Sequence, residues 1–281
     1  MSVNNTHWFA YHGALLPRVS PHINITLTPQ EQQELLSKSN AYFLRWTSDF
    51  DTPKETSFWY VIKDQKESLE DYKSNTRNQI KKALTLCSVS HVNASMIAEH
   101  GYPIYKQASI RYKNFTKISL DEFTQQHYTL SNDSHHEFWL LQDKKSAAYI
   151  GYAHTLIEGE MCHYSSIKLN PAYLKQYGGY ALIYTMNLHY LNERNFAYVN
   201  DGARSIAHDT NIQKFLIQKF HFRKAFCTLH ITYHKKIRWL IWLLYPFRHL
   251  FGYFNTIFMH KIHTLLIQEE LRRNDDQSNP L

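Results

Sequence analysis

The sequence predicts an α/β fold with a mixed, largely antiparallel central sheet flanked by helices. Three observations lead to this prediction. Stretches with the period of a strand alternate with stretches of helical period, three strand candidates follow one another closely within residues 137–169, and the order after them is helix, strand, helix, strand. Consecutive strands joined by short turns pair antiparallel, whereas strands separated by a helix can pair parallel.

Length and composition narrow the class of protein. The chain has 281 residues, of which 43% are hydrophobic and 20% charged, with a net charge of +7. These values describe an ordinary folded chain and exclude collagen-like, low-complexity and disordered classes. The N-terminal residues lack the pattern of a secretion signal, and no run of about 18 apolar residues occurs. The three cysteines form no CxxC pair, so we expect a cytoplasmic protein without a disulfide framework.

Residues 1–57 are predicted to be an irregular extension packed on the core. They contain four prolines and one clear helical stretch, TPQEQQELLSK, which opens with a threonine cap. From Phe58 the pattern is sharper, with the strand FWYVIK, a helix over residues 68–87 capped by Ser68, and the short strand SVSHV. Two further helices are expected over residues 94–112 and 120–128.

The second half of the predicted core begins with the strands EFWLLQ, AAYIGYAHTLI and MCHYSSIKL. The last two are joined by a tight Glu-Gly-Glu turn at residues 158–160. The helix YALIYTMNLHYLNER, the strand AYVND, the helix DTNIQKFLIQKF with its Asp209 cap and the strand AFCTLHITYH follow. The core domain is therefore predicted to span residues 58–234.

Residues 235–281 form a predicted helical tail that is both aromatic and basic. Its apolar cluster is broken by Pro246 and flanked by Lys235, Lys236, Arg238 and Arg248. Trp and Tyr beside cations suit a bilayer surface, so one interpretation is a membrane-surface contact through residues 235–258, at the inner face of the membrane. The simpler interpretation, which we favour, is a pair of helices that cover the sheet or a second subunit, as in a homodimer.

The stretch IKLNPAYLKQYGGYAL, residues 167–182, carries the strongest chemical signal. Glycine is scarce, with 8 residues where an average chain of this length has about 20, yet Gly178 and Gly179 are adjacent. Such a pair indicates a backbone conformation or a close approach that a side chain would forbid. The pattern predicts a strand that ends at Pro171, a polar loop, and a helix that begins near Tyr180.

A helix start of this kind can hold a phosphate group, because its first amides are unpaired and the helix dipole adds positive potential. Gly179 and the small Ala181 would let the backbone approach phosphate oxygens, and Lys175 would add a cation. We therefore expect an anionic cofactor to bind at this point of the chain.

Here the sequence resembles the GNAT superfamily of acyl-CoA N-acyltransferases. Their pyrophosphate loop, Q/R-x-x-G-x-G/A after a strand that ends apolar-x-apolar-x-Pro, is similar to Gln176-x-x-Gly179-x-Ala181 after Ile167-x-Leu169-x-Pro171. The order of elements from Phe58 to His234 also matches, and QKFHFRKAF resembles the family's xKxGF turn, with Phe222 in the aromatic place. The resemblance implies an enzyme that moves an acyl group, an acetyl group above all, from acetyl-CoA to a primary amine of a small molecule or peptide by direct attack.

The resemblance also implies which residues bind coenzyme A. The strand backbone at Ile167 and Leu169 would fix the pantetheine arm and polarise the thioester carbonyl. The implied pyrophosphate-binding residues are Lys175, Gln176, Gly178, Gly179, Tyr180 and Ala181. The sequence departs from the family pattern at two points. The spacing from Pro171 to Gln176 is two residues longer than usual, and Ile217 occupies the place of the tyrosine that often acts as general acid.

Proton transfer needs another residue, and Asp201 and His208 are the predicted catalytic residues. Asp201 follows the strand after the signature helix, where such sheets splay open, and a histidine with a pKa near 6.5 is an effective base at neutral pH. The alternatives are that Asp201 only makes a turn and that His208 only precedes a helix cap. No HExxH or Cys/His spacing indicates a metal site.

Two other functions stay open. YKSNTRNQIKKALTLCSVSHV is similar to the first helix of FemAB-like acyltransferases, which implies aminoacyl-tRNA or an acyl carrier protein as donor, although its cations also suit a solvated helix face. Residues 1–57 are too few for a second copy of the fold, which FemAB-like proteins carry. The third hypothesis is a binding module that kept the fold and lost activity. A specific nucleic-acid partner is not expected, because the basic charge is spread along the chain.

Overall fold

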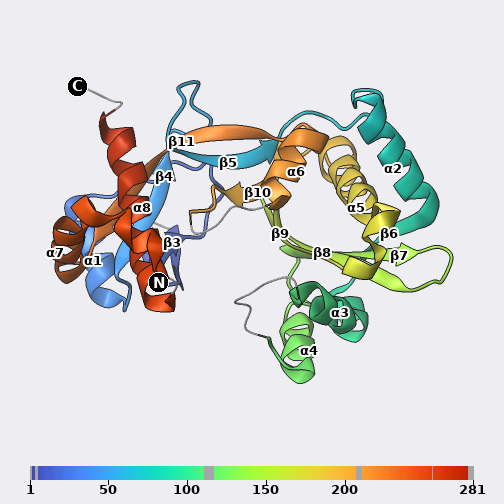
Figure 1. Ribbon diagram of the computed structural model, residues 1–281, viewed down its shortest axis with the longest axis horizontal. Coiled ribbons are helices and arrows are strands. Elements are labelled where there is room, and N and C mark those ends of the chain that lie inside the picture. The colour runs from blue at the N-terminus through green and yellow to red at the C-terminus, as the bar shows by residue number, and fades with distance from the viewer. Residues whose placement is uncertain (1, 4–5, 111–116, 207–210, 255, 278–281) are drawn as a thin grey trace. The chain divides into compact units, whose positions relative to one another are not determined.

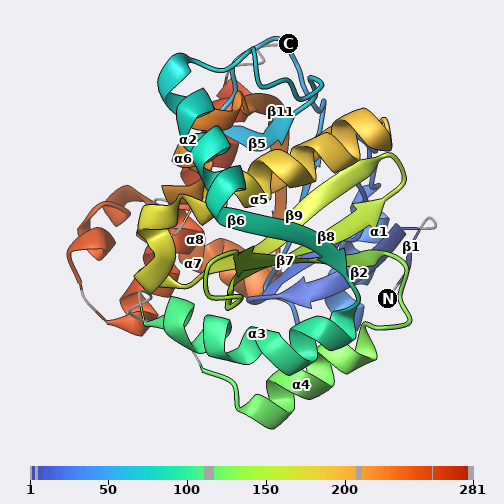
Figure 2. The ribbon, with the colours of Figure 1, turned by 90° about the vertical axis from the view of Figure 1, so that its right-hand side faces the viewer.

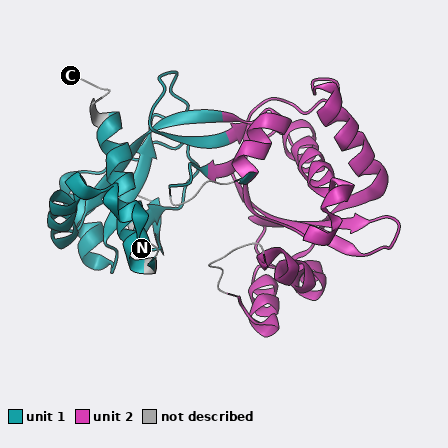
Figure 3. Ribbon diagram, viewed as in Figure 1, with its two compact units in different colours: residues 1–61, 203–211, 224–281 teal, residues 62–202, 212–223 magenta. Residues whose placement is uncertain are grey.

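The structure is a computed structural model that describes residues 2–3, 6–110, 117–206, 211–254 and 256–277. The chain forms two compact units (Figures 1 and 3). Unit 1 comprises residues 1–61, 203–211 and 224–281, and unit 2 comprises residues 62–202 and 212–223. Residues 1–61 and 224–281 thus belong to one unit. The sequence pattern instead predicts the boundaries of the core domain at 57/58 and 234/235.

Unit 1 contains strands that the sequence analysis missed. The segment predicted to be irregular apart from one helix forms β1 (Ser2–Val3), β2 (Thr6–Tyr11), β3 (Ala14–Pro17) and β4 (Phe43–Ser48). The strand order runs β1-β2-β3-β4-β11, and β4 pairs antiparallel with β11 (Arg223–Tyr233). β5 (Phe58–Lys63) starts in this unit, and its last two residues belong to unit 2.

Helices cover both faces of the unit 1 strands. α1 (Pro29–Lys38) has the predicted Thr28 cap, with Glu31 completing a capping box, and Leu35 packs with Leu15 and Leu44. α8 (Ile257–Gln277) packs Leu271 against Phe43 and Leu229. Because neighbouring residues of a strand point to opposite faces, Phe43 and Leu44 place α8 and α1 on opposite sides. The shorter α7 (Lys235–Leu244) buries only Ile241.

Unit 2 contains the predicted mixed, largely antiparallel strand arrangement. The order is β10-β9-β8-β7-β6, with antiparallel pairs from β6 to β9 and a parallel pair between β9 and β10. The strands are β6 (Cys87–Val92), β7 (His136–Asp143), β8 (Tyr149–Glu158), β9 (Met161–Leu169) and β10 (Tyr198–Ala203). The three consecutive strands predicted from residues 137–169 are confirmed, and β9 has the predicted bounds.

The helices of unit 2 lie on both faces of these strands (Figure 2). α2 and α5 pack together on one face, and α3 and α4 pack on the other. Their bounds are Ser74–Leu86 for α2, Ala94–Ser109 for α3, Leu120–Thr129 for α4 and Gly178–Asn187 for α5, which continues as a π-helix over Leu188–Glu193. α6 spans Asn211–Phe220.

The sequence predicts helix caps at Ser68 and Asp209. α2 begins six residues later than expected, and Ser68 does not cap it; the Ser68 hydroxyl donates to the Glu70 carboxylate instead. The predicted cap Asp209 lies outside the described residues. Among the helices that the structure describes, none has the length and apolar character needed to cross a membrane.

Candidate functional site

The parallel strands β9 and β10 pair over three residues each, the first third of β9 and the first half of β10. The register runs from Tyr198 beside Met161 to Asn200 beside His163, and β9 continues to Leu169. The later part of β9 therefore has a backbone edge that β10 does not use. An open strand edge offers amide and carbonyl groups for hydrogen bonds to a ligand.

A β-bulge lies where β9 separates from β10. On the other edge of β9, Tyr164 is opposite Thr155 and Ser166 is opposite His154, so Ser165 is an extra residue. A bulge bends its strand and re-aims the side chains beyond it, and bulges are common beside active sites. The predicted acyl-binding backbone at Ile167 and Leu169 lies just after this bulge.

Asp201 lies one residue beyond the last paired position of β10. Burial raises the pKa of its carboxyl group to about 7. Within the part of the chain that the structure describes, the carboxyl group has no hydrogen-bond or ion-pair partner. An unpartnered, partly buried carboxyl group with a pKa close to neutral can accept and release a proton at physiological pH.

Tyr164 shares the face of Asp201. His163 and Asn200 are the last paired residues, so Tyr164 and Asp201, each one residue later, point to the opposite face from His163. Burial raises the pKa of the Tyr164 hydroxyl well above its usual value, and the charge of Asp201 contributes in the same direction. Tyr164 is thus a neutral phenol at neutral pH.

A buried hydrogen-bond network holds Tyr164 in place. Its hydroxyl donates to Asn187 Oδ1 at 2.7 Å, and Asn187 Nδ2 donates to Glu67 Oε2 at 2.7 Å. The ammonium group of Lys63 lies 3.5 Å from the same carboxylate and donates to the Phe220 carbonyl at 3.1 Å. The sequence analysis missed these residues, because a lysine in a strand and a glutamate in a loop give no signal of pairing.

The other predicted catalytic residue, His208, lies outside the described residues. The structure instead places His163 beside the end of β10: a Cβ atom added at Gly202 would lie 3.4 Å from His163 Cε1. Burial lowers the pKa of the His163 imidazole, so this ring is neutral over most of the physiological range. The chain carries 18 histidines, and nothing in its sequence distinguished this one.

The diglycine segment differs from the predicted loop. Residues Pro171–Gln176 form a 3₁₀ helix, Tyr177 adopts the left-handed conformation with φ of 59°, and α5 begins at Gly178 rather than near Tyr180. The two glycines allow the start of α5 to approach the strands beneath it closely. A Cβ atom at Gly178 would lie 2.6 Å from Leu141 Cδ2, and one at Gly179 would lie 3.1 Å from Leu169 Cδ1. They let α5 pack tightly on β7 and β9.

The remaining predicted cofactor residues have different surroundings. Lys175 is exposed, whereas Ala181 is fully buried beside Leu141 and Ile150 and offers no surface to a ligand. The Tyr180 amide donates to the Tyr177 carbonyl at 2.7 Å. The Gln176 side chain faces Cys87, whose Sγ donates to Gln176 Oε1 at 3.8 Å.

These positions fit a phosphate group only at the surface. The amides of Gly178 and Gly179 begin α5 and have no acceptor within the helix, and Lys175 supplies positive charge. The cavity under the glycines is about 10 Å³, lined mostly by apolar side chains such as Leu169 and Leu174, and has room for at most one water molecule. A diphosphate would therefore lie on the helix start and not inside this cavity.

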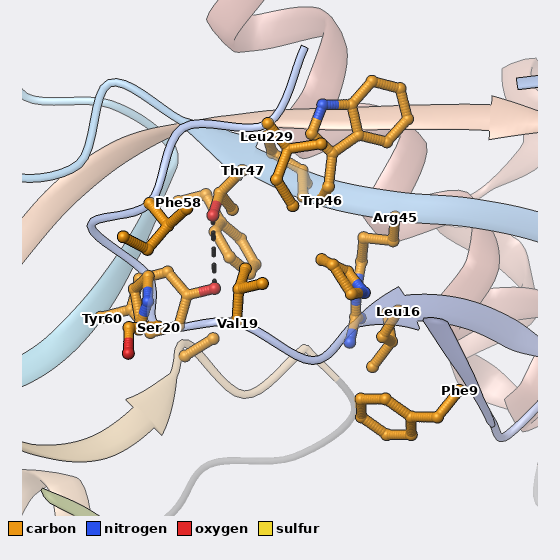
Figure 4. Close-up of a pocket in the computed structure, with 15 residues that line it drawn as sticks. Phe9, Leu16, Val19, Ser20, Arg45, Trp46, Thr47, Phe58, Tyr60 and Leu229 are labelled. Atoms are coloured by element: carbon orange, nitrogen blue, oxygen red, sulfur yellow. Dashed lines mark hydrogen bonds between the residues drawn. The ribbon is translucent and has the colours of Figure 1, made fainter. Parts of the chain in front are cut away.

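A larger cavity of about 110 Å³ lies in unit 1 (Figure 4). Its lining is mainly apolar and includes the polar groups of Arg45, Thr47 and Tyr60, with the Tyr60 hydroxyl 3.3 Å from Thr47 Oγ1. Sites for cofactors usually measure 300 Å³ or more, and no predicted site residue lines this cavity. We therefore do not assign the acyl donor to it. The described residues also include no cluster of three or more His, Cys, Asp or Glu side chains placed to hold a metal.

Comparisons with known proteins bear on the fold. No family model matches the sequence, and no curated protein sequence matches it. Among solved structures, FemX aligns with a TM-score of 0.52 and 11% identity, over 70% of this chain and 73% of FemX. A domain assigned to a lysylphosphatidylglycerol synthetase from Agrobacterium fabrum aligns with a TM-score of 0.52 and 9% identity, over 80% of this chain and 79% of that domain.

The chain has a GNAT-like fold. The fold expected from the Gln176-x-x-Gly179-x-Ala181 pattern and from the order of elements is thereby confirmed, and its structural neighbours include FemAB-like proteins, as the basic α2 sequence indicated.

Proposed function

We propose that this chain is an N-acyltransferase in which Asp201 removes the proton of the attacking amine. The observation that carries the proposal is the buried carboxyl group of Asp201 at the point where β9 and β10 separate, which has no partner among the residues that the structure describes. The shape of β9 also supports the proposal. β9 bulges and leaves β10 at the point where Asp201 follows the last paired residue of β10.

Asp201, the β9 backbone and the start of α5 then have defined roles in the reaction. The Asp201 carboxylate accepts the proton from the amine nitrogen as the new N–C bond forms, which matches its pKa of about 7 to the working pH. Backbone amides on the β9 edge that β10 does not use would donate to the oxygen of the acyl carbonyl as negative charge develops there. The α5 amides of Gly178 and Gly179, with Lys175, would hold a phosphate group of the donor. Acetyl-CoA, when bound, would supply the thioester: its C–S bond breaks as the N–C bond forms, and coenzyme A leaves as the thiolate.

A FemAB-like donor, aminoacyl-tRNA or an acyl carrier protein, is the second candidate. The observation in its favour is the charge around the start of α5. The Lys82 ammonium group lies 5.2 Å from the Tyr177 ring, and Lys81 and Lys175 are exposed. A shallow cationic surface suits a large polyanion better than a small cofactor that needs an enclosing pocket.

Acylation of a panel of primary amines tests the function. The protein would be incubated with acetyl-CoA and lysine, an amino sugar or a polyamine, and the products identified by mass spectrometry. We expect a transferred acetyl group and a rate at least 100-fold lower in Asp201→Asn. Glu160→Gln, which removes an exposed carboxylate at the turn before β9, is the control and should leave the rate unchanged. A rate that Asp201→Asn does not reduce would exclude Asp201 as the base.

Salt dependence separates the donors. Binding of a transfer RNA to the cationic surface should weaken by tenfold or more between 50 and 200 mM salt, because phosphate contacts release counterions. Binding of coenzyme A, which has few charges, should change much less. Binding of either ligand without any turnover would favour the third hypothesis, a binding module without activity.

A further inference from the structure

The segment from α7 to the start of α8 exposes an unusual number of large apolar side chains. We call this set the tail surface; its members are Trp239, Leu240, Trp242, Leu243, Phe247, Leu250, Tyr253, Phe254 and Phe258. Trp239 and Trp242 are 68% and 66% exposed, and their rings contact each other edge to face. Soluble monomers rarely leave so many neighbouring apolar side chains in water, and such patches usually bind a protein or a membrane.

The tail surface is not needed for the core of unit 1. α7 turns Ile241 inward, with Ile237 and Leu244 half-buried one turn to either side. A surface helix normally carries polar residues on its other side. α7 carries two tryptophans and two leucines there beside its three basic residues, so a large part of its outward side is apolar.

The exposed charges at the start of α7 are all positive, whereas Arg248, farther along the tail surface, is paired with Glu270 of α8. No Asp or Glu occurs between Asp209 and Glu269 in the sequence. Lys235, Lys236 and Arg238 are exposed, and none forms an ion pair with any residue in the described ranges. They occupy the first turn of α7, where the helix dipole disfavours cations, so an external anion would offset an unfavourable field.

We propose that the tail surface binds the surface of an anionic phospholipid membrane. Tryptophan and tyrosine rings suit the boundary between headgroups and acyl chains, and adjacent cations are attracted to acidic lipids. A ten-residue helix lies in the interface and does not cross it. A symmetric dimer through the same surface would bring two sets of exposed cations together, and the Glu270 carboxylate at this surface is already paired with Arg248, which makes a second copy the weaker occupant.

Co-sedimentation of the full chain with vesicles tests this proposal. We expect binding to vesicles that contain about 30% phosphatidylglycerol, at least tenfold weaker binding to phosphatidylcholine alone, and release by high salt. The double variant Trp239→Gln/Trp242→Gln should lose at least tenfold in affinity. Lys235→Glu/Lys236→Glu should lose the preference for the acidic lipid while keeping its folded circular-dichroism spectrum.

A control is Tyr128→Gln, which removes an exposed aromatic ring, 48% exposed, from α4. It should bind vesicles as the parent protein does. Two outcomes would overturn the proposal. One is full-length protein that stays in the supernatant with acidic vesicles, and the other is a dimer in analytical ultracentrifugation that the tryptophan double variant converts to monomer. These readouts do not depend on acyl transfer, so they can fail while the proposed function stands.

Discussion

Asp201 is the residue whose chemistry can be checked without a substrate. Its carboxyl group has a higher pKa in the folded chain than in an unfolded one, where it lies near 3.8. Burial of this carboxyl group costs little free energy of folding while the group is protonated and uncharged. Its contribution to stability is fully present below the unfolded pKa and is lost as the pH rises through about 7.

Asp201→Asn should therefore stabilise the protein at high pH and have little effect at low pH. Asparagine keeps the shape of the protonated acid and cannot ionise. We expect a gain on the order of 2 kcal/mol at pH 8 and close to zero at pH 4, measured by urea unfolding. An equal effect at both pH values would mean that the carboxyl group titrates normally.

The two glycines at the start of α5 can be compared directly. Gly178→Ala places a methyl group 2.6 Å from Leu141 Cδ2 and should destabilise the chain by about 1–3 kcal/mol, whereas Gly179→Ala, at 3.1 Å from Leu169, should cost less. Alanine is otherwise the better helix former, so intrinsic propensity predicts the opposite sign. Denaturant unfolding decides between them; a Gly178→Ala protein as stable as the parent would contradict the packing role.

At the site, local sequence order could suggest some residues and not others. Asp201 was predicted as a catalytic residue from its place after a predicted strand, and the glycines stood out because they are rare. Ala181 was assigned to the cofactor from the motif, yet it packs in the core. Asn187 and Glu67 meet across 120 residues of sequence, and only the packing of α5 brings them together.

At the scale of elements, the Lys63–Glu67 pair links β5 to the core of unit 2. Both side chains are almost fully buried, and burial lowers the pKa of the Lys63 ammonium group. Lys63→Met should destabilise the protein by about 3–5 kcal/mol, because it leaves the Glu67 carboxylate buried without a cation. The double variant Lys63→Met/Glu67→Gln should recover much of this loss in urea unfolding. No recovery would show that packing at Lys63, and not its charge, is what matters.

Most elements between Phe58 and His234 were predictable, because each combines a clear period with turn or cap residues. α4 and β9 are examples, with Ser119 accepting from the Glu122 amide at the start of α4. The strands β2, β3 and β4 were not. They are four to six residues long, and prolines in and around them suggested irregular chain. Their core residues, such as Trp8 and Leu44, are scattered until the strands pair.

At the scale of the whole molecule, the C-terminal helix α8 is part of the structure and not an appendage. The Asp275 carboxylate accepts from the Ser57 amide at 2.7 Å, and Leu266 and Leu271 are buried. Deletion of residues 257–281 should therefore give an insoluble protein or lower the Tm by 10 °C or more. Trp239→Gln/Trp242→Gln should leave the Tm within about 2 °C of the parent. A soluble truncated chain with an unchanged Tm would contradict this role for α8.

The pH dependence of acyl transfer tests the central claim most directly. With the amine that the product analysis identifies, kcat/KM of the parent protein should rise with pH and level off as Asp201 ionises near pH 7. Asp201→Asn should lose this rise together with at least 100-fold in rate, while Glu160→Gln should retain both. A profile in Asp201→Asn that keeps the same inflection and the same rate would contradict the assignment of Asp201 as the catalytic base.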